Sequence, residues 1–213
     1  MKLIEAIKHK ENPYWIPDCT RDDFIDFFKE LGFKTGAEIG VSLGINLETY
    51  CKAGFKMYGI DPWEDYDDEH YRPINALSKK GIVTKTFDDV YEIAIDRLLK
   101  YTNCDIIRRK SMDALDYIHD RSLDFVYIDS NHKYGYVAMD LMQWAKKVKK
   151  GGIIAGHDYY DIKGSRQNRG VKHAVDGFMK SFDIENFWVL GSKDPKKGEK
   201  TERALSYFCF KHW

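Results

Sequence analysis

The sequence has no excess of either charge, since its 213 residues include 34 lysines and arginines and 34 aspartates and glutamates. Dedicated nucleic-acid binders and proteins that bind membrane surfaces normally carry a basic excess, so this balance argues against both classes. No stretch approaches the roughly 18 apolar residues of a membrane-spanning helix, and the first residues lack the long apolar segment of a signal peptide. We therefore expect a soluble, cytoplasmic protein.

Cysteine is scarce as well, and the four cysteines are scattered without any C-x-x-C spacing. This pattern supports neither a zinc knuckle nor a disulfide framework. Three of the four lie in or beside apolar runs, where a free thiol behaves as a small hydrophobic side chain. We expect buried free thiols, which agrees with a reducing compartment.

Repeats and low-complexity linkers are also absent, which favours one domain over residues 1–213. The hydrophobic fraction of 43 % is enough for a sizeable core in a chain of this length. Within residues 1–34 we expect a helical extension, because Thr20 suits an N-cap and an apolar stripe runs from Phe24 to Leu31.

The rest of the chain alternates between apolar runs typical of strands and segments typical of helices. The expected strands are 36–41, 55–60, 104–109, 123–128, 151–156, 187–191 and 204–210. The expected helices are 45–53, 87–101, 112–117, 136–148 and 171–182, after the first one at 20–31. On helix 136–148 we expect Trp144 and Met142 to be core residues.

This alternation predicts a parallel sheet with helices on both faces. The last two strands are joined by a charged loop without a helix, so they can be neighbours only as a hairpin. We predict an α/β fold with a Rossmann-like, doubly wound, mostly parallel sheet of seven strands. One C-terminal hairpin strand should be antiparallel.

Ligands of such sheets bind beyond the carboxyl ends of the strands. The first strand ends in a turn with Gly40 and Gly44, preceded by Glu38, and the second strand ends in Asp61. Glycines let the backbone approach a ligand, and an acid about 20 residues later can bind ribose hydroxyls. The middle glycine of the dinucleotide motif G-x-G-x-x-G is missing, and Glu38 would repel a pyrophosphate. Cationic S-adenosylmethionine suits the turn better than NAD, which stays open as an alternative.

Three segments, EIGVSLG, YGIDPW and DFVYIDSNHKYGYVAMDLMQWAKKVKKGGIIAGHDYY, resemble class I S-adenosylmethionine-dependent methyltransferases in order and spacing. The resemblance covers residues 36–160 and is closest to the branch of macrocin-type sugar O-methyltransferases and cephalosporin-hydroxylase-like proteins. It implies the seven-stranded methyltransferase sheet. It also implies cofactor contacts, which are Glu38, Gly40 and Gly44 at the methionine end, Asp61 at the ribose, Ser111 and Met112 at the adenine, and Asp129 at the junction with the substrate.

The resemblance further implies a metal and a base. In the sugar O-methyltransferases that the sequence resembles, acids matching Asp129 and positions 157 and 158 bind magnesium, and a histidine matching His132 is the general base. A cation on a sugar hydroxyl would make its proton easier to remove. Because position 157 is a histidine here, the set Asp129, His157 and Asp158 has only two carboxylates. Magnesium or manganese would fit it, a softer ion stays open, and His157 could instead hold Asp158 in place.

The acceptor side is less well defined. Residues 62–85 and 159–170 follow two strands and should rim the pocket, where Arg166 and Arg169 would either clamp an anionic acceptor or face solvent. We predict a methyltransferase that uses S-adenosylmethionine to methylate a hydroxyl group of a small polar acceptor such as a sugar, with His132 and Asp129 as catalytic residues. The alternatives are a non-catalytic S-adenosylmethionine-binding module and an NAD-linked oxidoreductase. The oligomeric state stays open, a homo-oligomer included.

Overall fold

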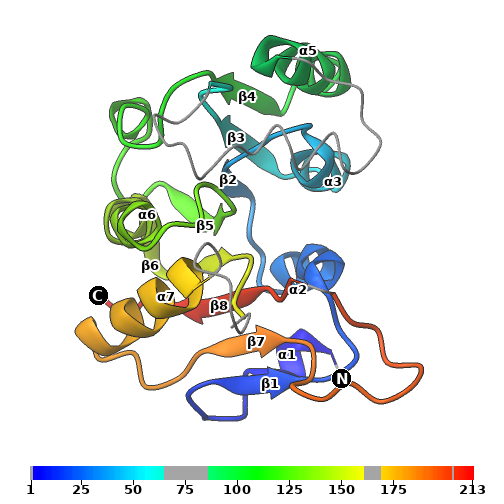
Figure 1. Ribbon diagram of the computed structural model, residues 1–213, viewed down its shortest axis with the longest axis vertical. Coiled ribbons are helices and arrows are strands. Elements are labelled where there is room, and N and C mark those ends of the chain that lie inside the picture. The colour runs from blue at the N-terminus through cyan, green and yellow to red at the C-terminus, as the bar shows by residue number, and fades with distance from the viewer. Residues whose placement is uncertain (1, 65–85, 161–168, 203) are drawn as a thin grey trace.

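A computed structural model describes residues 2–64, 86–160, 169–202 and 204–213. In these residues eight strands form one sheet in the order β1-β7-β8-β6-β5-β2-β3-β4 (Figure 1). The strands are β1 (Tyr14–Ile16), β2 (Thr35–Ile39), β3 (Lys56–Ile60), β4 (Cys104–Ile107), β5 (Leu123–Ile128), β6 (Val148–Gly156), β7 (Trp188–Leu190) and β8 (Tyr207–Phe210). The α-helices are α1 (Leu3–Ala6), α2 (Phe24–Glu30), α3 (Ile45–Lys52), α5 (Phe87–Leu98), α6 (Tyr134–Lys147) and α7 (Arg169–Ser181), and the 3₁₀ helices are η1 (Arg21–Asp23) and η2 (Leu115–Tyr117).

All neighbouring strands run parallel except in the two pairs that contain β8. This strand lies between β6 and β7 and is antiparallel to both. The predicted hairpin is confirmed, because a chain that returns to the neighbouring position without a crossover must run in the opposite direction. The Rossmann-like, doubly wound and mostly parallel α/β fold is confirmed with it.

The predicted number of seven strands is wrong, because the described residues form eight. The additional strand is β1, which pairs in parallel with β7 from Tyr14 opposite Trp188 to Ile16 opposite Leu190. Its three residues are too few to show an alternating pattern, and prolines at positions 13 and 17 flank it. Pairing with the edge of β7, rather than a local signal, makes this segment a strand.

Two hydrophobic cores lie on opposite faces of the sheet, because successive strand residues point to opposite sides. On β5, Phe125 and Tyr127 belong to the core under α1, α2, α3 and α5, whereas Val126 and Ile128 belong to the core under α6 and α7. All four side chains are buried. A central strand covered on both sides reads as a continuous apolar run, and this run ends only at Asp129.

The N-terminal extension packs into the first of these cores. The predicted helix 20–31 is present as η1 followed by α2, and the aromatic rings of Phe24 and Phe28 are fully buried. The ring of Phe28 lies 4.3 Å from that of Phe125, centroid to centroid. At the start of η1, the carboxylate of Asp23 accepts a hydrogen bond from the backbone N–H of Thr20 at 2.8 Å. The extension is therefore anchored to the central strand of the sheet.

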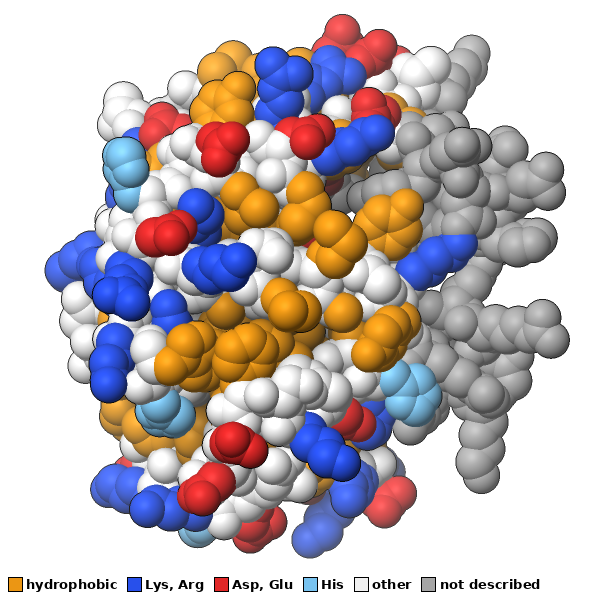
Figure 2. All heavy atoms as spheres, turned by 90° about the vertical axis from the view of Figure 1, so that its left-hand side faces the viewer, with side chains coloured by type: hydrophobic (Ala, Val, Ile, Leu, Met, Phe, Trp, Pro, Cys, Tyr) orange, Lys and Arg blue, Asp and Glu red, His pale blue; other side chains and the backbone are white. Residues whose placement is uncertain are grey.

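The outer face of α6 is apolar, and Figure 2 shows hydrophobic side chains gathered on the side that α6 and α7 cover. Tyr134, Tyr136, Met139 and Met142 are each at least 50 % exposed. Trp144 is buried as predicted, but the prediction that Met142 is a core residue is wrong. Two residues apart on a helix means about 200° around its axis, so both cannot face the core. Tyrosine and methionine are typical of protein interfaces, and the homo-oligomer stays a prediction.

The cysteines agree with the expectation of free thiols, since all four are free and Cys19, Cys51 and Cys209 are buried. No helix in the described part of the chain is long and apolar enough to cross a membrane.

Candidate active site

The tips of β2 and β5 approach each other closely at Gly40. This glycine has a φ of +93°, and a Cβ at its position would lie 2.1 Å from the backbone oxygen of Asp129. The amide of Gly40 donates to the carbonyl of Ile60, and the amide of Asp129 donates to the carbonyl of Ile39, both at 2.8 Å. Gly44, with a φ of +74°, is the N-cap of α3. A glycine is needed at both positions, which leaves bare backbone where three strands end.

Glu38 places a buried carboxylate next to this turn. It is 1 % exposed, its Oε1 accepts a hydrogen bond from Asn46 Nδ2 at 2.9 Å, and its Oε2 has no hydrogen-bond partner among the described residues. Burial raises the pKa of Glu38 to about 8, and the Asn46 hydrogen bond and the charge of Arg21 offset this only in part. An unpaired buried oxygen is costly, so this group suits a ligand that brings a positive charge.

Asp61 is held at the end of β3 by backbone amides. Its Oδ2 accepts from the N–H of Ser42 at 2.9 Å and its Oδ1 from the N–H of Trp63 at 2.8 Å. The Trp63 indole in turn donates to the carbonyl of Ser42 at 2.9 Å. Burial raises the pKa of Asp61, while these amide donors act in the opposite direction. Each carboxylate oxygen keeps further acceptor capacity, as the predicted ribose contact requires.

Three of the predicted catalytic and metal-binding side chains meet beyond β5 and β6. Nε2 of His132 lies 3.0 Å from Oδ2 of Asp158 and 3.7 Å from Oδ1 of Asp129. One donor atom from each residue lies within 4.8 Å of the others, so the three could hold one ion. Burial lowers the pKa of His132, but the two carboxylates outweigh it and hold this pKa above its ordinary value. Burial likewise opposes ionisation of Asp129, yet the neighbouring positive groups lower its pKa.

His157 is not part of this group, and the predicted metal set of Asp129, His157 and Asp158 stays a prediction. Its Nδ1 lies 3.4 Å from the hydroxyl of Ser206, and its Nε2 lies 3.8 Å from a carboxylate oxygen of Glu202. Both 157 and 158 lie beyond the end of β6, and Asp158 has a φ of +60°. This left-handed residue, which aspartate tolerates better than most side chains, directs Asp158 to His132 while His157 faces elsewhere. In the described residues the imidazole that lies between the two carboxylates is that of His132.

The hydroxyl group of Ser111 has its hydrogen-bond partners on α6. Its hydroxyl donates to Oδ1 of Asp140 on α6 and accepts from the Trp144 indole at 2.7 Å. The other oxygen of Asp140 accepts from the hydroxyl of Ser130 at 2.5 Å. Burial raises the pKa of Asp140, and the two serines offset this in part. The loop after β4 is thereby tied to the loop that follows Asp129. The half-buried Met112 packs against the core under α6 and α7, and the adenine contacts of Ser111 and Met112 stay predictions.

The two predicted rim loops lie mostly outside the described residues, as does Arg166, and the side chain of Arg169 is not described either. Of the first loop, Trp63 is buried and Glu64 pairs with Lys110 at 2.9 Å. The predicted clamp for an anionic acceptor therefore stays a prediction.

A family model described as a methyltransferase domain matches residues 33–159. The chain belongs to this family. The match ends just after Asp158 and contains Glu38, Asp61, Asp129 and His132. This family match argues against the alternative of an NAD-linked oxidoreductase.

Solved structures show that the methyltransferase domain has the fold of enzymes that bind S-adenosylmethionine. The O-methyltransferase TomG from Streptomyces achromogenes, in complex with S-adenosylmethionine, is 12 % identical with a TM-score of 0.57, covering 89 % of this chain and 78 % of that one. An O-methyltransferase from Bacillus cereus, in complex with S-adenosylhomocysteine, is 14 % identical with a TM-score of 0.55, covering 89 % and 80 %. A protein from Clostridium thermocellum that is proposed to be an rRNA methylase is 15 % identical with a TM-score of 0.56, covering 87 % of this chain and 93 % of that one. These identities establish the fold alone.

A curated relative, the uncharacterized protein y4gI of Sinorhizobium fredii, is 24 % identical over 128 residues. The aligned part is 57 % of this chain but only 12 % of that protein. The match therefore covers only about an eighth of the length of this relative.

Sequence reasoning missed two charged residues that lie beside the candidate site but outside residues 33–159. Arg21 begins η1, and its Nη1 lies 3.8 Å from Oδ2 of Asp129. Glu202, in the loop before β8, lies 3.6 Å from Nε of Arg21 and also accepts from the backbone N–H of this residue. Neither shows a sequence signal, because Arg21 reads as an ordinary residue of a helix start and Glu202 as part of a charged loop.

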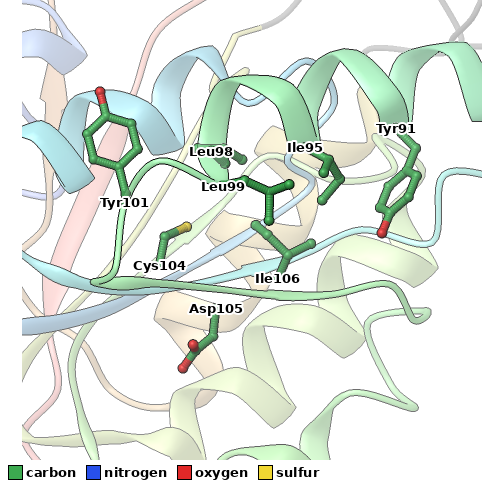
Figure 3. Close-up of a pocket in the computed structure, with 8 residues that line it drawn as sticks. All are labelled: Tyr91, Ile95, Leu98, Leu99, Tyr101, Cys104, Asp105 and Ile106. Carbon is green, nitrogen blue, oxygen red and sulfur yellow. The ribbon is translucent and has the colours of Figure 1, made fainter.

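A groove of about 360 Å³ opens elsewhere, between α5 and β4 (Figure 3). Its lining includes Tyr91, Leu99 and Ile106, together with Cys104 at the amino end of β4. Because β4 is the last strand of the sheet and the groove reaches its amino end, this hollow is distinct from the strand tips that carry Asp129 and Asp61.

Proposed function

We propose that the chain transfers a methyl group from S-adenosylmethionine to a hydroxyl group of a small polar acceptor, such as a sugar, as in the macrocin-type branch. The observation that carries the proposal is the convergence of Asp129, His132 and Asp158 beside the glycine turn of β2. In-line methyl transfer to a hydroxyl needs an aligned acceptor and a group that removes its proton. An imidazole between two carboxylates supplies such a group.

The donor fits the residues present. Glu38 offers a buried oxygen without a hydrogen-bond partner among the described residues. Gly40 keeps side-chain atoms away from the place where the tips of β2 and β5 meet. S-adenosylmethionine carries a sulfonium and an ammonium group, and the acids at these strand tips suit both. Asp61 would accept from the ribose hydroxyls, with its carboxylate already oriented by the amides of Ser42 and Trp63.

A divalent cation also fits, because two carboxylates, completed by water, are a donor set for magnesium or manganese. When bound, such an ion lowers the pKa of an alcohol or water oxygen that contacts it. In our proposal Asp129 and Asp158 hold the ion, and Nε2 of His132 receives the proton of the acceptor hydroxyl. The carboxylate of Asp158, 3.0 Å away, would stabilise the charged imidazole.

The test compares donor binding with turnover. Calorimetry with S-adenosylhomocysteine measures donor binding, and a coupled assay of S-adenosylhomocysteine release measures transfer to methyl glycosides as acceptor probes, with and without EDTA. We expect His132→Ala and Asp158→Asn to lower kcat at least about 100-fold while changing donor affinity less than about threefold. Asp124→Asn is the control, because Asp124 is the second residue of β5 and lies at the opposite end of the strand, where it pairs with Lys149 at 2.6 Å.

Donor binding with unchanged turnover in both variants would remove the proposed mechanism. Donor binding without turnover of any hydroxyl probe would favour the non-catalytic module. A titration with Mn²⁺ separates the roles of the site residues, since Asp158→Asn should weaken Mn²⁺ binding and Asp124→Asn should not.

A further inference from the structure

Arg21 lies across the strand tips although it belongs to the N-terminal extension, outside residues 33–159 that match the family. Its guanidinium is 3.8 Å from Asp129 and 3.6 Å from Glu202, while its backbone N–H donates to Glu202. The packing of α2 against β5 and the contact with the loop before β8 fix it from two sides. The extension thus delivers one positive charge into a group of acids.

The methionine end of S-adenosylmethionine, which the proposed function places at these strand tips, carries two opposite charges, an ammonium and a carboxylate. Glu38 and Asp129 suit the ammonium, but they would repel the carboxylate unless a cation stood beside them. The charge of Arg21 acts on both acids and lowers the pKa of each. Arg97 does not serve here, because it faces the carbonyl of Leu43 and the carboxylate of Glu48.

The guanidinium still has N–H groups with which to bind a carboxylate. Its two ion-pair distances of 3.6 and 3.8 Å are longer than a hydrogen bond, so Glu202 and Asp129 do not use up its five N–H donors through these contacts. The side chain is 35 % exposed, so a ligand can reach it. A planar guanidinium matches a carboxylate in a bidentate manner, which a lysine cannot do.

We infer that Arg21 binds the carboxylate of the donor's methionine end, and that Glu202 orients Arg21 for this contact. The inference rests on the proposed use of S-adenosylmethionine, and it adds a binding residue that lies outside the family match. It also explains why a half-buried arginine stands among acids without a hydrogen bond to Asp129, an arrangement that contributes little to stability by itself.

The experiment uses two ligands that differ only in this carboxylate, S-adenosylhomocysteine and its decarboxylated analogue S-adenosyl-3-thiopropylamine. Calorimetry on the full chain should show that the wild type binds S-adenosylhomocysteine about 10- to 100-fold more tightly, the range expected for a charge-assisted pair. Arg21→Gln should lose this preference by weakening S-adenosylhomocysteine alone. Arg21→Lys, which keeps the charge without the fork, should retain part of the preference.

Lys200→Gln is the matched control, because Lys200 pairs with Asp23 of the same 3₁₀ helix at 4.0 Å and does not contact Asp129. It should keep the full preference. Equal weakening of both ligands by Arg21→Gln, or no weakening of either, would overturn the inference, and Arg21→Lys decides the matter if Arg21→Gln does not fold. A wild type that binds neither ligand overturns the proposed function as well, whereas binding without methyl transfer overturns only the proposed chemistry.

Discussion

Substitution of Glu38 by glutamine should remove a pH dependence from donor binding. Burial raises the pKa of Glu38 to about 8, so in the ligand-free protein about 1 % of these side chains are ionised at pH 6 and about half at pH 8. The ammonium group of a bound ligand favours the ionised form, so binding releases a proton over this range. The ratio of the wild-type affinity for S-adenosylhomocysteine to the affinity of Glu38→Gln should therefore rise about 50-fold from pH 6 to pH 8.

Calorimetry at pH 6, 7 and 8, in two buffers with different ionisation enthalpies, measures both the affinity and the number of protons released. The ligand's own amino group titrates as well, but it does so equally in both proteins and cancels in the ratio. A ratio that stays constant from pH 6 to pH 8, or a wild type that releases no proton at pH 7, would refute the reasoning.

The same carboxyl group should shape the stability of the ligand-free protein. Because its folded-state pKa of about 8 lies above the unfolded value of 4.5, the folded state binds the proton more tightly. Stability is therefore lost as the pH rises from about 5 to about 8, by about 4 kcal/mol at pH 8, and little more is lost above it. The melting temperature of Glu38→Gln should exceed that of the wild type by a margin that grows with pH and then levels off.

Three further substitutions test the backbone and the residues that support the site. In Gly40→Ala the Cβ would lie 2.1 Å from a backbone oxygen, so this variant should lose about 2–4 kcal/mol of unfolding free energy and should no longer bind S-adenosylhomocysteine. Gly135→Ala, with open space around the glycine, should keep or raise the unfolding free energy and leave binding unchanged. Asp140→Ala leaves the hydroxyl groups of Ser111 and Ser130 without their acceptor, and it should lower the free energy of unfolding, measured in urea, by about 2–4 kcal/mol. Asp140→Asn should cost less than half of that. Equal losses in the two variants would argue against the hydrogen bonds as the cause. Arg97→Gln removes the hydrogen bond of 3.0 Å from the guanidinium to the carbonyl of Leu43 in the glycine turn, and it should weaken the binding of S-adenosylhomocysteine about 10-fold. Lys100→Gln loses only a contact to Glu48, which Arg97 also contacts, and it should leave the affinity unchanged. Similar affinities for these two variants would contradict a positioning role of Arg97.

Much of the fold follows from local patterns in the sequence. The double-sided apolar run of β5, the phenylalanine stripe of α2 and the helix-free loop before β8 each predict their element, because periodicity and connection type are properties of neighbouring residues. The three residues of β1 carry no such pattern, so that only the edge of β7 makes them a strand.

The candidate site divides in the same way. Gly40, Asp61 and Asp129 could be placed from the sequence alone, since a strand that ends in a glycine or an acid brings that residue to the carboxyl edge of a parallel sheet. The sequence could not tell which of His157 and Asp158 faces the site, because the left-handed backbone at Asp158 decides it. Nor could it place Arg21 beside Asp129, since the two residues are 108 positions apart along the chain. Tertiary packing of the N-terminal extension, rather than any local pattern, brings that charge to the strand tips.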